Sequence, residues 1–264
     1  MTDTTHRARK RFGQNFLHDR YIIGKIIAAI NPQPDDAVVE IGPGLGAITR
    51  PLLNQLNRLT VVELDRDLAA RLRAEFPAPS KVVVIEADAL KTDFAALTTQ
   101  THPLRVVGNL PYNISTPLMF HLLTFKQQIR DMHFMLQKEV VERLASAPNC
   151  KSYGKLSVMI QYHCQVAKLI DVPPGAFNPP PKVDSAVVRL IPKSPSLPAN
   201  DIHHLDRLVS VCFQQRRKTL RNSVKVLLAG QPTPTDLGID LARRPETLTV
   251  NEFVSLSNQL IAQS

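Results

Sequence analysis

Short apolar runs recur along the first half of the chain and alternate with segments in which apolar residues keep helical spacing. Such alternation is typical of βαβ units, which build a parallel sheet. The pattern predicts an α/β fold: a Rossmann-like, mostly parallel sheet with helices on both faces. The expected strands are residues 37–41, 59–64, 82–87, 104–107 and 132–136.

The pattern changes on either side of this region. Isoleucines at helical spacing predict a helix within residues 12–30, and further helical patterns occupy residues 138–146 and the segment after Tyr153. Apolar runs at 164–172 and 184–191 surround a proline-rich loop. We expect these two runs to be antiparallel additions to the sheet.

The last quarter of the chain has a different character. Residues 192–200 are rich in proline and serine, which is typical of a linker. Thr249 and Glu252 fit a capping box before the final helix. We therefore predict a first domain of residues 1–193 and a small all-helical domain of residues 194–264. The helical domain is expected to hold helices at 202–216, 218–228 and 250–262, with a short turn at 235–241.

A glycine-rich segment follows the first expected strand of the sheet. Gly42 and Gly44 lie directly after it, with Ala47 three residues on. Glycines at this position let the backbone approach a ligand closely. Taken alone, the spacing also fits a nicotinamide-dinucleotide fingerprint, so the segment does not identify its ligand.

Three carboxylates near successive strand ends narrow the choice. Glu40 precedes the glycines, where it would repel a diphosphate but suit a cationic ligand. Glu63 can bind both hydroxyls of a ribose, and Asp88 can accept from an adenine amine. The pattern favours an adenosyl cofactor without a pyrophosphate.

Asn109-Leu110-Pro111-Tyr112 follows the fourth expected strand. Asn109 offers a side-chain oxygen as acceptor, and Pro111 restricts Leu110 so that its carbonyl can be aimed. Tyr112 offers a flat face on which a base can stack. Two acceptors and a platform suit an adenine amino group; the alternative is a strand-to-helix turn in which asparagine is a cap.

The charge of the chain points to a polyanionic partner. The net charge is +9, and residues 207–225 hold six basic residues and no acidic one. The candidates for phosphate contacts are Arg216, Arg217, Lys218 and Arg221, with residues 7–11 second. Helical spacing predicts Arg217 and Arg221 on one face. The alternative is an ordinary solvated helix face.

Three isolated cysteines show no metal-binding spacing, so we expect no metal and a reducing, cytoplasmic location. No apolar run approaches the length of a membrane helix, and residues 1–11 lack the apolar core of a signal peptide.

Seven segments in order resemble the S-adenosylmethionine-dependent ribosomal RNA adenine dimethyltransferase family that modifies small-subunit RNA. The matching segments are residues 13–17, 40–46, 63–65, 87–89, 108–115, 177–185 and 214–221. The resemblance implies a first domain that binds S-adenosylmethionine and a second that binds RNA. It implies two methyl groups on each of two adjacent adenosines near the 3′ end of 16S ribosomal RNA. We also expect small-subunit ribosomal RNA or an immature 30S particle as the partner, and a monomeric enzyme.

The resemblance also implies roles for individual residues. In the catalytic site, Asn109, Leu110 and Tyr112 would hold the adenine, and Phe177 would close on it from the other side. The alternative for Phe177 is a core aromatic beneath the proline-rich loop. The expected cofactor-binding residues are Gln14, Asn15, Leu17, Gly42, Gly44, Glu63, Leu64, Asp88, Ala89 and Asn109.

Other interpretations remain open. Erythromycin-resistance methyltransferases share the earlier motifs but act on large-subunit RNA. DNA adenine and protein glutamine are acceptors for enzymes with similar elements. A ribosome-assembly factor without catalysis and a nicotinamide oxidoreductase are the remaining alternatives; the intact Glu63, Asp88 and Asn109 argue against the former, and Glu40 against the latter.

Overall fold

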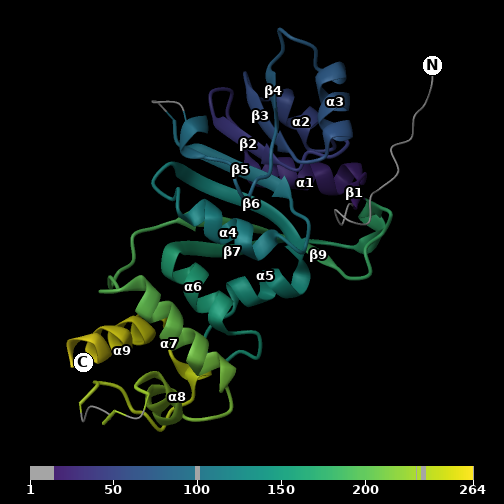
Figure 1. Ribbon diagram of the computed structural model, residues 1–264. Coiled ribbons are helices and arrows are strands. Elements are labelled where there is room, and N and C mark those ends of the chain that lie inside the picture. The colour runs from purple at the N-terminus through teal and green to yellow at the C-terminus, as the bar shows by residue number, and fades with distance from the viewer. Residues whose placement is uncertain (1–14, 99–101, 230, 233–235, 264) are drawn as a thin grey trace. The chain divides into compact units, whose positions relative to one another are not determined.

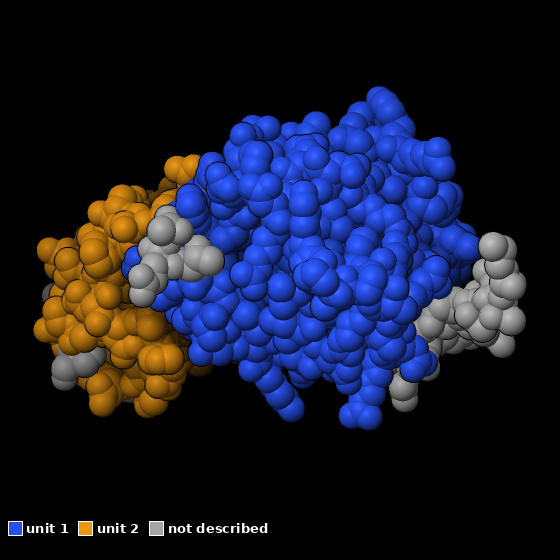
Figure 2. Space-filling model, turned by 90° about the horizontal axis from the view of Figure 1, so that it is seen from above, with its two compact units in different colours: residues 1–141, 167–192 blue, residues 142–166, 193–264 orange. Residues whose placement is uncertain are grey.

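The computed structural model describes residues 15–98, 102–229, 231–232 and 236–263 (Figure 1). The chain divides into two compact units, which Figure 2 distinguishes by colour. Unit 1 comprises residues 1–141 and 167–192, and unit 2 comprises residues 142–166 and 193–264.

A seven-stranded sheet of order β4-β3-β2-β5-β6-β9-β7 organises unit 1. The five expected strands pair in parallel, and β9 pairs antiparallel with β6, so the Rossmann-like prediction is confirmed. Successive residues of β5 and β6 are buried, which requires cover on both faces of the sheet. The strands are β2 (Ala37–Ile41), β3 (Leu59–Glu63), β4 (Val82–Glu86), β5 (Leu104–Asn109), β6 (Ile129–Gln137), β7 (Cys164–Val172) and β9 (Ser185–Pro192).

Chain order reverses at β2, which lies between β3 on one side and β5 on the other. A ligand crevice forms at such a switch point, outside the carboxyl ends of the strands. The helices that connect these strands are α2 (Thr49–Leu53), α3 (Arg66–Glu75) and α4 (Ser115–Leu123), and α5 (Lys138–Ala145) follows β6.

The first helix lies within the predicted range of residues 12–30. Helix α1 spans Arg20–Ile30, because the side chain of Asp19 accepts hydrogen bonds from the Tyr21 and Ile22 amides and so caps it there. Before it, β1 (Phe16–Leu17) pairs antiparallel with β8 (Phe177–Asn178), a pairing that the apolar pattern did not predict. The first described residues therefore lie against the proline-rich loop.

A buried arginine near the amino-terminal end of β5 links α1 to the sheet. Arg105 is 4% exposed and pairs with Asp131 at 3.0 Å and with Asp36 at 2.7 Å. Its guanidinium also donates to the carbonyl oxygens of Ile30 and Asn31, the last turn and cap of α1. A charge this deep is tolerable because it is paired and hydrogen-bonded.

Unit 2 is helical. It contains α6 (Lys155–His163), α7 (Ile202–Gln214), α8 (Leu220–Leu227) and α9 (Val250–Ala262). The predicted capping box of Thr249 and Glu252 begins α9. The unit border at Pro192 and Lys193 lies beside the predicted boundary at residue 193.

Residues 142–166 belong to unit 2 as well, which differs from the predicted first domain of residues 1–193. The side chain of Lys155 bonds both Asp206 and Ser210 of α7, more than fifty positions along the chain. Such distant pairings leave no local signal. Among the described residues, no helix combines the length and apolar character needed to span a bilayer.

Candidate active site

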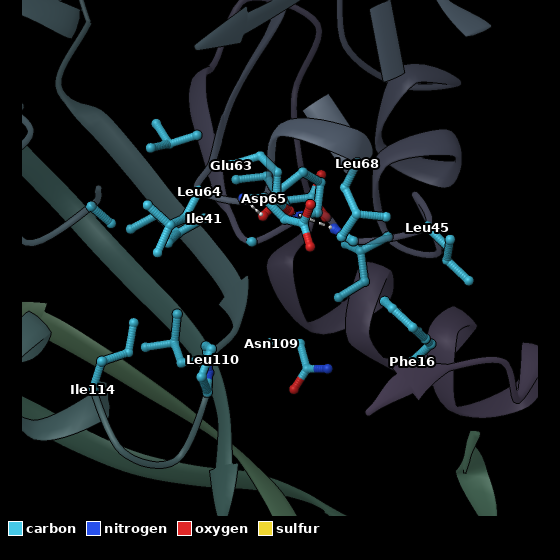
Figure 3. Close-up of a pocket in the computed structure, with 18 of the residues that line it drawn as sticks. Phe16, Ile41, Leu45, Glu63, Leu64, Asp65, Leu68, Asn109, Leu110 and Ile114 are labelled. Carbon is cyan, nitrogen blue, oxygen red and sulfur yellow. Dashed lines mark hydrogen bonds between the residues drawn. The ribbon is translucent and has the colours of Figure 1, made fainter. Parts of the chain in front are cut away.

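A cavity of about 180 Å³ opens in unit 1 at the carboxyl ends of β2, β3, β4 and β5 (Figure 3). Figure 3 shows Glu63, Leu64 and Asp65 grouped on one side of it, with Asn109 and Leu110 on another. Gln14 lies outside the described residues. The predicted residues that line the cavity are Asn15, Leu17, Gly42, Gly44, Glu63, Leu64, Asp88, Ala89, Asn109, Leu110 and Tyr112.

The glycine-rich loop follows β2 with a backbone that favours glycine. Gly42 and Gly44 have φ angles of 65° and 58°. A side chain on Gly44 would lie 3.2 Å from the ring of Phe16, which closes the cavity from β1. The loop thus presents its backbone, rather than side chains, to the cavity.

Glu63, the last residue of β3, is fixed by the backbone around it. One carboxylate oxygen accepts from the Gly44 amide at 3.2 Å and the other from the Asp65 amide at 2.9 Å. Burial raises the pKa of Glu63, although these hydrogen bonds oppose the effect. The remaining lone pairs of an oriented carboxylate suit a pair of hydroxyl donors.

Glu40 lies deeper, 2% exposed, and accepts a hydrogen bond of 2.7 Å from the Thr49 hydroxyl. Burial raises the pKa of Glu40 to about 7, and the nearby Glu63 charge adds to the rise. Two buried carboxylates on one wall favour a cationic ligand, which would relieve their mutual repulsion. The role of Thr49 could not be predicted from the sequence, since no spacing links it to Glu40.

Asp88 follows β4 and lines another part of the cavity. Its side chain accepts from the Leu90 amide, which orients the carboxylate beside Ala89. Leu64, 51% exposed, presents a large apolar side chain on the same cavity. An exposed leucine beside oriented acceptors is suited to a flat heterocycle with an amine at its edge.

Asn109 ends β5 with its amide oriented. The side-chain nitrogen donates to the Asn15 carbonyl oxygen at 3.0 Å, while the side-chain oxygen accepts nothing from the described residues. Helix α4 begins at Ser115 with Ile114 as its cap, so Asn109 is not the turn cap of the alternative interpretation. An acceptor therefore remains available at the cavity.

The backbone around Asn109 is also closely held. A side chain on Gly108 would come within 2.6 Å of the Ile41 carbonyl oxygen, so only glycine lets β5 approach β2 this closely. The Leu110 amide donates to the Met135 carbonyl oxygen of β6.

Tyr112 is held at its outer end. Its hydroxyl oxygen lies 3.0 Å from the hydroxyl oxygen of Ser185 on β9. Sequence reasoning missed this partner, which lies 73 residues away along the chain. No local pattern links the two residues, so only the folded chain reveals the pair.

Phe177 does not line this cavity. It is 3% exposed and lies opposite Leu17 in the pairing of β1 with β8, within the apolar core. The pairing that brings β1 to the cavity wall buries this ring. The arrangement corresponds to the core aromatic of the alternative interpretation and leaves no face of Phe177 for a base in this conformation.

The basic segment is not one helix. Helix α7 ends at Gln214 and α8 begins at Leu220, so Arg217 and Lys218 lie in the turn between them and share no helical face with Arg221. All three side chains are exposed. The expected alignment on one face is therefore wrong, because the chain breaks the helix there.

Arg216 has a different environment. It pairs with Glu246 at 2.7 Å and donates to the carbonyl oxygens of Cys150 and Lys151, all within unit 2. The positive charge of Arg216 is thus neutralised by Glu246, an acidic residue thirty positions further along the chain. Arg216 joins three segments of unit 2 and is unsuited to a phosphate contact. In the described part of the chain, no cluster of three or more His, Cys, Asp or Glu residues could hold a metal.

The chain is similar along most of its length to known proteins. Ribosomal RNA small subunit methyltransferase A of Acinetobacter baylyi is 61% identical over 257 residues, which cover 97% of this chain and 93% of that protein. The protein of the same name from Aeromonas hydrophila is 58% identical, covering 98% and 96%.

Solved structures show the same fold. A dimethyladenosine transferase from Plasmodium falciparum superposes with a TM-score of 0.75 at 28% identity, covering 91% of this chain and 95% of that one. The 23S rRNA methyltransferase ErmE gives a TM-score of 0.68 at 25% identity, covering 94% and 100%. A sequence model of the ribosomal RNA adenine dimethylase family matches residues 5–262. The chain belongs to the ribosomal RNA adenine dimethylase family.

Proposed function

We propose that the protein transfers methyl groups from S-adenosylmethionine to the N6 amines of two adjacent adenosines near the 3′ end of 16S ribosomal RNA. The products are N6,N6-dimethyladenosines, and the reaction is part of small-subunit biogenesis. The observation that carries the proposal is one cavity that combines a glycine loop, oriented carboxylates and the free acceptor of Asn109.

The hydrogen-bond acceptors that line the cavity fit an adenosyl sulfonium. Backbone amides orient both Glu63 and Asp88. Glu63 would accept from the ribose hydroxyls, and Asp88 would accept from the adenine amine beside Leu64. Burial raises the pKa of Glu40 and of Glu63, and a ligand with positive charge would stabilise the ionised forms of both carboxylates. When bound, the cofactor supplies an electrophilic methyl group.

The chain contributes acceptors for the target amine. Asn109 Oδ1 and the Leu110 carbonyl oxygen would accept its two hydrogens, which favours the pyramidal nitrogen whose lone pair attacks. The same oxygens stabilise the positive charge that develops on that nitrogen. Tyr112 would hold the ring plane by stacking. The alkylated amine is acidic and loses its proton without a strong base in the site.

The RNA must present an adenine that has left its stack, because the acceptors lie within a cavity. Phosphate contacts then fix the register of the RNA without reading its sequence. We assign these contacts to the exposed Arg217, Lys218 and Arg221. Residues 7–11, the second candidate, lie outside the described residues. We further propose that the substrate is an immature 30S particle in the cytoplasm and that the enzyme acts as a monomer.

Labelled S-adenosylmethionine and small subunits that lack the modification test the proposal. After incubation the RNA is digested and its nucleosides are identified. We expect label in N6,N6-dimethyladenosine at two adjacent positions of the small-subunit RNA. Large subunits serve as the alternative acceptor, since a 23S rRNA methyltransferase shares the fold. Label confined to the large subunit would overturn the proposal.

A further inference from the structure

The aromatic side chain of the Asn109–Tyr112 segment is held from a distant strand. The hydroxyl oxygens of Tyr112 and Ser185 lie 3.0 Å apart. Ser185 is fully buried at the start of β9, opposite Gln137 at the end of β6. Tyr112 is half-buried and lines the cavity. A buried residue on β9, a strand that lies between β6 and β7, thus contacts the hydroxyl end of a ring that lines the cavity.

Other contacts of the segment restrain only its backbone. The Leu110 amide donates to the Met135 carbonyl oxygen, and the Ser115 hydroxyl donates to the Tyr112 carbonyl oxygen. Neither contact fixes the Tyr112 side chain, which rotates about two bonds. A hydrogen bond at the phenol oxygen, with the backbone held, restrains rotation about the Cα–Cβ bond and so fixes the position of the ring. Because a phenolic O–H prefers to lie in the plane of its ring, the direction to Ser185 also favours one orientation of that plane.

The position of Ser185 suits this task. Ser185 sits in the ladder that pairs β9 with β6, and the adjacent Asp184 carbonyl oxygen accepts from the Lys138 amide. Its hydroxyl therefore stands on a rigid element, whereas Tyr112 stands on a loop. The restraint passes from the sheet to the ring.

We infer that Ser185 is a positioning residue for methyl transfer: its hydroxyl holds in place the Tyr112 ring against which the target adenine stacks. This inference rests on the proposed function. Without the Ser185 hydroxyl, the base would still enter the cavity, but its amine would spend less time aligned with the acceptors of Asn109 and Leu110. Misalignment lowers the rate of the methyl-transfer step and leaves the cofactor site unchanged.

A double-mutant cycle tests the inference. Ser185→Ala and Tyr112→Phe each remove the same hydrogen bond, and Tyr112→Phe keeps the stacking face. Each should lower the single-turnover rate, with both substrates saturating, by roughly two- to twelvefold, the range of one net hydrogen bond. The double variant should be no slower than the slower single variant, because either substitution alone already removes the shared hydrogen bond.

Further measurements separate positioning from a general structural effect. S-adenosylmethionine affinity, measured by calorimetry, should be unchanged in Ser185→Ala. Ser185→Thr retains the hydroxyl and should recover most of the rate. Ser223→Ala, which alters a fully buried serine of unit 2, is the matched control and should leave the rate unchanged.

Two results would overturn the inference while leaving the proposed function intact. The first is a Ser185→Ala rate equal to that of the wild type. The second is a double variant whose rate reduction is the product of the two single reductions. If the wild-type protein transfers no methyl group to small-subunit RNA, the proposed function itself fails, so the two failures are distinguishable.

Discussion

The side chain of Asn109 has two ends with different tasks. Its nitrogen donates a hydrogen bond to the Asn15 carbonyl oxygen, and its oxygen is left to accept from a ligand. An uncharged amide can donate at one end and accept at the other. The residue type is therefore set by its structural partner as much as by the chemistry we propose for it.

Asn109→Ala removes the proposed acceptor and should lower the single-turnover rate of methyl transfer by about a hundredfold to a thousandfold, the usual cost of removing a transition-state hydrogen bond. Asn109→Asp should also be impaired, since it places an oxygen against the Asn15 carbonyl oxygen. The control is Asn54→Ala on an exposed position after α2. An Asn109→Ala rate within about threefold of the wild type would refute the amine-holding mechanism.

Glu63 is the residue on which we expect cofactor affinity to depend most. Glu63→Ala should weaken S-adenosylmethionine binding by about 1.5 to 3 kcal/mol, because it removes charge-assisted hydrogen bonds to the ribose. Glu86→Ala is the matched control: it changes a carboxylate at the end of the neighbouring strand that pairs with Arg66 and Arg73 instead. Calorimetry that finds equal affinity for both variants would remove Glu63 from the site.

Elements were predictable where the signal was local. The five parallel strands follow from continuous apolar runs, and α9 follows from its capping box. The pairing of β1 with β8 was not predictable, because two-residue strands have no period and their partners lie far apart in sequence. The same limit hid the Arg216–Glu246 and Tyr112–Ser185 pairs, which only the folded chain brings together.

The amino-terminal edge of the sheet depends on one side chain. Arg105→Ala would leave Asp131 buried without this partner and α1 without its link to β5, at a cost of about 3 to 5 kcal/mol in the free energy of unfolding. Arg130→Ala is the control, because Arg130 pairs with Asp36 from a largely exposed position and should cost at most about 1 kcal/mol. Urea denaturation measures both. Equal destabilisation would show that the buried network adds no more than a surface pair.

For binding of RNA by the whole molecule, the net charge of +9 matters less than the positions of exposed basic side chains that have no acidic partner. Arg216 contributes to the net charge but is engaged within unit 2. Arg217, Lys218 and Arg221 are exposed and available to phosphates. Composition alone treats these four residues as equivalent, whereas the folded chain separates them.

Neutralising Arg217, Lys218 and Arg221 together should weaken RNA binding and flatten its salt dependence. The slope of log K against log salt should fall by up to about 0.7 to 0.9 for each phosphate that the variant no longer neutralises. Cofactor affinity should stay the same. Arg216→Ala should instead lower stability and leave the salt slope as it is. A triple variant with the wild-type slope would place the RNA path elsewhere on the molecule.

The pairing of β1 with β8 also sets the order in which the enzyme can mature during its own synthesis. The residues of β1 are made before those of β8, so they have no strand to pair with until residues 177–178 have emerged. Likewise, the hydrogen bond between Tyr112 and Ser185 can form only after Ser185 has been made. A nascent chain that ends before these residues would hold the glycine loop and the carboxylates but not a closed pocket. We therefore expect the cofactor pocket to close only after residues 177–178 have been made.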